Sequence, residues 1–86
     1  MLGVTMPPEE DEPQPITAAA AAERLRLKPA TIRSWAHRYG ARKHGTYKRQ
    51  TVYDWPDLAT IDYCIHAGRP VPATAEERDK LRPAAA

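Results

Sequence analysis

Apolar positions recur with a helical period in the first half of the chain and predict two helices there. Residues 18–25 are rich in alanine, and Thr17 before them is a typical N-cap, so a first helix is expected over this stretch. A second helix is expected from Pro29, whose missing amide proton is harmless in a first turn, to Gly40, which ends it. Its apolar side chains should face the core: Ile32, Trp35, Ala36 and Tyr39.

The connection between these two helices is short, because only residues 26–28 separate them. So few residues allow only a tight turn, and the helices must cross at a steep angle with Leu25, Leu27 and Ile32 between them. The spacing therefore predicts a helix-turn-helix.

Residues 41–53 lose the helical period and predict two short strands, with a turn at His44-Gly45. A third helix is expected from about Pro56 to Ala67, capped by Asp54 and stopped by Gly68. Its apolar stripe, which should pack on the first two helices, is Leu58, Ile61 and Ile65.

The two ends of the chain differ from this middle part. Residues 1–15 hold four prolines and four acids, and they predict a disordered arm. The predicted domain spans residues 16–68 and is mainly α-helical with a small β-hairpin. Residues 69–86 predict a linker and a short polar helix, which begins at the capping box of residues 74–77 and ends near Arg82. How that helix attaches to the domain stays open.

Composition adds that 86 residues support one domain, while the distribution of charge points to a partner. The net charge is only +2, yet residues 24–49 hold nine bases and no acid. Nine cations without counter-ions repel one another unless a polyanion neutralises them, and phosphate is the obvious candidate. The block consists of Arg24, Arg26, Lys28, Arg33, Arg38, Arg42, Lys43, Lys48 and Arg49.

The second helix should present a polar face, because its apolar residues fix which side points inward. The outward residues are then Ala30, Arg33, Ser34, His37 and Arg38. An α-helix fits the major groove of DNA, where Arg pairs with guanine, so Arg33 is the first candidate for a base contact. Ser34, His37 and Arg38 are expected to contact bases or phosphate beside it. Lys28 and Thr31 at the helix start are expected to hold a phosphate. On the hairpin, residues expected to contact the minor groove or the backbone are Arg42, Lys43, Thr46, Lys48 and Arg49.

Two segments together resemble a known family. The stretch ITAAAAAERLRLKPATIRSWAHRYG, followed by GTYKRQTVYDWPDL, is similar to the MerR-like winged helix-turn-helix class, which includes phage excisionases and small actinobacterial regulators. The resemblance covers roughly residues 16–68. It implies a recognition helix over residues 29–39 in a major groove, a wing over residues 41–53 beside it, and several copies bound head to tail on DNA.

Other residues suggest little further chemistry. A single cysteine, Cys64, gives no disulfide and no zinc spacing, and His66 two residues later should point to another side of the helix, so no metal is expected. No cofactor is expected either. Trp35 and Trp55 are assigned to the core because the chain has no Phe, whereas DNA contact and simple exposure both stay open for His37 and His44.

No apolar run approaches the ~20 residues of a membrane span, and the amino terminus lacks the features of a signal peptide. A cytoplasmic location, in a bacterial nucleoid or a host cell, is therefore predicted. The acidic arm is expected to be a solvated tail, with a DNA mimic that folds back on the basic block as the alternative.

The sequence thus predicts a small non-enzymatic, sequence-selective DNA-binding protein that controls site-specific recombination, regulates transcription, or both. Its expected partners are double-stranded DNA, further copies of itself bound cooperatively, and a recombinase. One alternative is the DNA-binding domain of a phage terminase small subunit. Another is a protein-interaction module or inhibitor that uses the basic face, and the basic block alone is also compatible with RNA.

Overall fold

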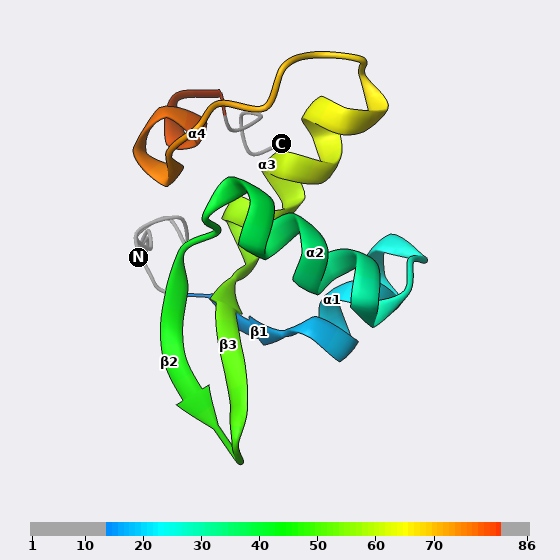
Figure 1. Cartoon of the computed structure of the whole chain (residues 1–86), viewed down its shortest axis with the longest axis vertical. Helices are drawn as coiled ribbons and strands as arrows, with labels where there is room; N and C mark the ends of the chain where they lie inside the picture. The colour runs from blue at the N-terminus through cyan, green and yellow to red at the C-terminus, as the bar shows by residue number, and fades with distance from the viewer. Residues whose placement is uncertain (1–13, 82–86) are drawn as a thin grey trace, which may run out of the picture.

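The computed structural model describes residues 14–81, which form a small α/β domain of four helices and a three-stranded antiparallel sheet (Figure 1). Residues 1–13 of the predicted arm lie outside the described residues. In chain order the elements are β1 (Pro15–Thr17), α1 (Ala18–Leu25), α2 (Pro29–Tyr39), β2 (Lys43–Tyr47), β3 (Gln50–Asp54), α3 (Trp55–His66) and α4 (Ala75–Leu81).

The first two helices form where their end signals predict. The Thr17 hydroxyl accepts a hydrogen bond from the Ala20 amide at 3.2 Å and caps α1. Arg26 ends α1 in the left-handed conformation, with φ of 60°, and turns the chain toward α2. Helix α2 begins at Pro29 and ends at Gly40, which is also left-handed. These observations confirm the predicted bounds of both helices and the short connection between them.

The sheet is larger than the predicted hairpin, because β1 adds a third strand that the sequence did not predict. The strand order is β1-β3-β2, and Ile16 of β1 lies opposite Tyr53 of β3. The Trp55 amide also donates to the Gln14 carbonyl at 2.8 Å, one residue before β1. Pro15 fits here because a proline at the start of an edge strand breaks no ladder hydrogen bond. Because Pro15 ends a proline-rich stretch, the sequence pattern did not indicate a strand there.

Helix α3 begins where predicted, but its buried face is turned from the predicted one. The Asp54 carboxylate accepts from the Asp57 amide at 3.2 Å and caps the helix. Leu58, Ile61 and Cys64 are fully buried, whereas Ile65 is 36% exposed, so its predicted place in the apolar stripe is wrong. Adjacent residues of a helix differ by about 100° in direction, and here the thiol of Cys64, rather than the larger Ile65, faces the core.

The hydrophobic core lies where α1, α2 and α3 meet the inner face of the sheet. It is built from small side chains, among them Ala21 and Ala36, together with the larger Ile32, Leu58 and Ile61. Both tryptophans pack against this cluster while partly buried, which agrees with their assignment to the core: Trp35 and Trp55.

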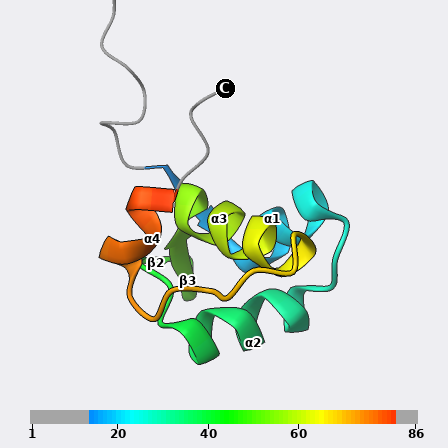
Figure 2. The ribbon, with the colours of Figure 1, turned by 90° about the horizontal axis from the view of Figure 1, so that it is seen from above.

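Helix α4 is held against the domain by polar contacts centred on a buried ion pair. The Thr74 hydroxyl accepts from the Glu77 amide at 3.2 Å, as the capping-box pattern predicts. Figure 2 shows the segment after α3 returning above α2 toward the hairpin, so that α4 lies beside the start of β2. There the side chain of Arg78 is completely buried and pairs with Asp57 of α3 at 2.6 Å. The sequence did not predict how this last helix attaches to the domain, and in the structure it attaches through polar contacts.

Candidate nucleic-acid interface

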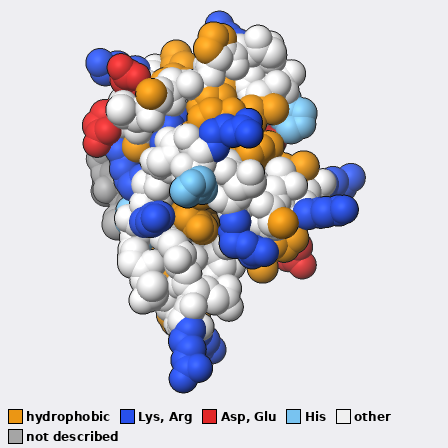
Figure 3. Space-filling view, viewed as in Figure 1, with side chains coloured by type: hydrophobic (Ala, Val, Ile, Leu, Met, Phe, Trp, Pro, Cys, Tyr) orange, Lys and Arg blue, Asp and Glu red, His pale blue; other side chains and the backbone are white. Residues whose placement is uncertain are grey.

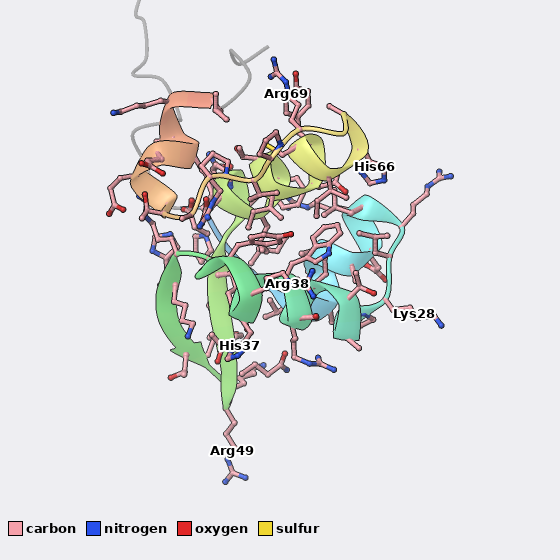
Figure 4. The ribbon with its side chains drawn as sticks, turned by 45° about the horizontal axis from the view of Figure 1, so that its top comes forward. Lys28, His37, Arg38, Arg49, His66 and Arg69 are labelled. Atoms are coloured by element: carbon pink, nitrogen blue, oxygen red, sulfur yellow. The ribbon has the colours of Figure 1, made fainter. Side chains whose placement is uncertain are left out.

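The outward face of α2 contains the side chains that the helical period predicts. Ile32 and Ala36 are buried, and the opposite side of the helix exposes Arg33, Ser34, His37 and Arg38. In Figure 4 the labelled His37 projects from α2 on the side away from α3, toward the hairpin. Two guanidinium groups, an imidazole and a hydroxyl on one helical face can donate hydrogen bonds to base edges or to phosphate.

The start of α2 offers less to an anion than the sequence suggests. Lys28 is the N-cap residue, is exposed, and forms no side-chain capping hydrogen bond. Pro29 has no amide proton, and the amide of half-buried Thr31 donates to the Lys28 carbonyl at 2.9 Å. Two of the first three helical amides are therefore not available to a phosphate. What remains at this end of α2 is mainly the charge of the Lys28 side chain.

The hairpin turns at Lys48-Arg49, so the predicted turn at His44-Gly45 is wrong. Lys48 and Arg49 have φ of 50° and 67°, the left-handed values that both central residues of a type I′ turn require. Gly45, with φ of 104°, lies inside β2, at a shift in register between β2 and β3. The glycine thus permits a bulge rather than a turn. The consequence is that two cations stand at the very tip of the hairpin.

The predicted hairpin contacts do not all lie in equivalent environments. Lys43, Thr46, Lys48 and Arg49 are exposed, and Figure 4 shows Arg49 extending beyond the tip. The exposed ring of Tyr47 lies beneath the Lys48 ammonium, which is 5.3 Å from its centroid. Tyr47, whose role is ambiguous from the sequence alone, is therefore a candidate partner in any contact that the tip makes.

Arg42 differs from the other predicted contacts because its guanidinium is already paired. It donates to both carboxylate oxygens of Asp79, at 3.2 and 3.0 Å, and lies 3.8 Å from a carboxylate oxygen of Asp54. The hydrogen bonds to Asp79 raise the pKa of Arg42, a side chain that is charged at neutral pH in any case. To contact DNA as predicted, Arg42 must exchange Asp79 for a phosphate.

The remaining cations of α2 and the hairpin have no carboxylate within 4.0 Å among residues 14–81: Lys28, Arg33, Arg38, Lys43, Lys48 and Arg49. We call these six the free cations. Figure 3 shows basic side chains spread over α2 and at the end of the hairpin, with acidic ones toward the edges of the view. One side of the domain thus presents a positive surface that runs from the start of α2 to the hairpin tip.

Two polar contacts beside this surface were missed by sequence reasoning. The His44 Nε2 lies 2.7 Å from Asp54, which ties β2 to the cap of α3. Arg78 pairs with Asp57 across 21 residues. Neither pair has a local sequence signal, because both depend on how α3 packs against the hairpin and α4.

Comparisons of this chain with known protein families, with curated proteins and with solved structures give no match. Within residues 14–81 there is also no helix with the length and apolar character needed to cross a membrane. The functional interpretation therefore depends on the geometry and charge of the surface itself.

Proposed function

We propose that this chain is a non-enzymatic, sequence-selective DNA-binding protein of the winged helix-turn-helix type, with α2 as the recognition helix and the β2–β3 hairpin as the wing. One observation carries the proposal: the free cations extend over an exposed helix and an adjoining exposed hairpin on one side of the domain. A helix fits the major groove, while a hairpin beside it reaches the flanking backbone or minor groove.

Different parts of this surface have different roles in the proposal. Arg33, near the middle of the outward face of α2, pairs with a guanine, and Ser34 and His37 contact bases or phosphate beside it. Lys48 and Arg49 at the tip neutralise phosphates and thereby position the helix without selecting a sequence. The surface is small, so useful affinity comes from several copies bound side by side on repeated sites.

Control of site-specific recombination, as in excisionases, is the favoured biological role, and regulation of transcription is the second. Both follow from the resemblance of residues 16–68 to the MerR-like class, in which the same surface serves either purpose. A recombinase would be the protein partner in the first role. Both roles require the same sequence-selective contact, which can be tested directly.

The test begins with DNA sites selected by the protein from a random pool. Arg33→Ala should weaken binding to the selected site by about tenfold to a hundredfold, as expected for one bidentate base contact, and should relax selection at one base pair. Arg69→Ala is the matched control, because Arg69 is an exposed arginine beyond the end of α3 and far from the hairpin tip (Figure 4). It should leave binding unchanged.

Salt dependence gives an independent measure of the phosphate contacts. About five such contacts predict a slope of log Kd against log salt with a magnitude of roughly 4 to 5. Equal binding of every DNA sequence by wild type and Arg33→Ala would contradict groove recognition. A flat response to salt would contradict the electrostatic part of the proposal, and in that case an acidic protein surface becomes the better partner.

A further inference from the structure

The connection between the proposed recognition helix and wing is short and firmly held. Only residues 40–42 separate α2 from β2. The Tyr39 and Gly40 carbonyls, at the end of α2, both accept hydrogen bonds from Arg78 of α4, at 2.9 and 3.1 Å. A cation is favoured at this end of a helix, where the backbone carbonyls have no helical partner.

The guanidinium of Arg78 uses every donor it has. Its Nε and Nη2 donate to the two oxygens of Asp57, at 2.6 and 2.8 Å, and Nη1 donates to the carbonyls of Tyr39 and Pro72, both at 2.9 Å. With the bond from Nη2 to Gly40, all five N–H groups are satisfied in a completely buried site. The planar fork therefore fixes the end of α2 relative to α3 and α4.

The far end of the connection is held by the same two helices. The Arg42 amide donates to Asp57 at 2.8 Å, so one carboxylate bonds both Arg78 and the first residue before the wing. Asp79, next to Arg78, holds the Arg42 side chain. The Arg42 carbonyl then accepts from the Asp54 amide at 2.9 Å, at the end of β3. An unbroken polar network thus connects the end of α2 with the base of the hairpin.

We propose that α4 sets the angle between α2 and the hairpin, with Arg78 as the positioning residue for DNA binding. A fully satisfied buried network resists rearrangement, because any other arrangement of its elements leaves buried donors or acceptors without partners. The consequence for DNA rests on the proposed function. Two elements at a fixed angle engage one duplex together, whereas elements at a variable angle lose the advantage of a high effective concentration.

The angle can be measured without DNA. Spin labels at Ala30→Cys and Gln50→Cys, both at exposed positions, report the distance between α2 and the hairpin, and Cys64 is fully buried and so inaccessible to the label. The distance distribution should be narrow in the otherwise wild-type chain and in Glu76→Gln, which removes an exposed acid of α4. It should broaden in Arg78→Lys, which keeps the charge but loses the fork. An unchanged distribution in folded Arg78→Lys overturns the proposal, and if that variant does not fold, the pair variant Asp57→Leu, Arg78→Met, which leaves no buried charge unpaired, decides in the same way.

The DNA arm compares the effect of the wing in two backgrounds. Arg49→Ala should weaken binding about tenfold in the wild-type chain but only about twofold in the Arg78→Lys chain, because a wing at a variable angle contributes less. Equal losses in both backgrounds overturn the positioning role. Because the spin-label arm contains no DNA, it gives its answer even where the chain binds no DNA at all, which keeps failure of the proposed function distinct from failure of this inference.

Discussion

Arginine has opposite environments at two places in this domain. At the corner where α4 meets α3, Arg78 is completely buried, and each of its N–H groups donates a hydrogen bond. On the outward face of α2, Arg33 and Arg38 are exposed and have no carboxylate within 4.0 Å among the residues that the structure describes. The first arginine is an internal part of the fold, and the other two belong to its surface.

The difference shows how to separate charges that hold the fold from charges that face a ligand. A buried guanidinium is tolerated only with its partners in place, because removing its water is expensive. Exposed cations without acids contribute little to folding, and together they produce the positive potential that attracts a polyanion. Arg42 lies between the two cases, since its side chain is 30% exposed and paired. We expect stability and DNA binding to respond separately to changes in the two groups.

Breaking the buried pair should have the largest effect. Arg78→Met keeps the volume of the side chain but leaves the Asp57 carboxylate buried without its partner, so the free energy of unfolding should fall by about 3–5 kcal/mol. Urea denaturation followed by circular dichroism measures the change. Arg33→Met is the control on the exposed face and should change the free energy by less than about 0.5 kcal/mol.

A second substitution tests the cause of that loss. Adding Asp57→Leu to Arg78→Met removes the unpaired carboxylate and should restore part of the stability, because the penalty comes from the isolated charge. If Arg78→Met is as stable as Arg33→Met, the distinction between the two groups of arginines is wrong.

Local signals were sufficient to predict the helices. Thr17, Asp54 and Thr74 all cap helices with their side chains, as their sequence contexts predict. The strand β1 and the position of the hairpin turn were not predictable in this way. A three-residue edge strand is stabilised by its neighbour rather than by its own sequence, and Lys48-Arg49 is an unusual pair for a turn that favours Asn-Gly.

The same limit applies to the candidate site. The outward face of α2 follows from the helical period alone, so Arg33, Ser34, His37 and Arg38 were found correctly as exposed residues. The pairing of Arg42 with Asp79 spans 37 residues and exists only because α4 returns to the hairpin. Because Arg42 lies in a basic stretch of the sequence, nothing local indicated that its guanidinium already pairs with an acid elsewhere in the chain.

The hairpin tip should show stability and binding changing in opposite directions. Lys48 and Arg49 hold left-handed backbone conformations that cost a residue with a side chain about 1 kcal/mol or more. The double variant Lys48→Asn, Arg49→Gly has the residues that this turn prefers, so it should raise the free energy of unfolding by about 1 kcal/mol. It should also weaken DNA binding and lower the magnitude of the salt slope by about 2, because two phosphate contacts are lost.

The matched control for the tip is Lys48→Gln, Arg49→Gln, which removes the same charges but keeps the unfavourable backbone. It should lose DNA affinity to the same extent with no gain in stability. If the Asn-Gly variant gains stability and binds DNA as well as the wild-type chain does, the tip lies outside the interface. The free cations that contact DNA are then those of α2.

Asp79→Asn should have the smallest effect on stability, although it lies next to Arg78. The side chains of Asp79 and Arg42 are 36% and 30% exposed, and ion pairs as open to water as this one contribute about 0.5 kcal/mol or less. Thermal unfolding in low salt should detect a small loss relative to Glu76→Gln, which removes the same charge from α4. In about 1 M salt the difference should disappear, because the screening length falls to about 3 Å. If Asp79→Asn loses as much stability as Arg78→Met, and the loss does not depend on salt, Arg42 also belongs to the charges that hold the fold. A small, salt-sensitive loss would instead place the boundary between the two groups at adjacent residues of one helix, where Arg78 holds the fold and Asp79 adjusts the base of the hairpin.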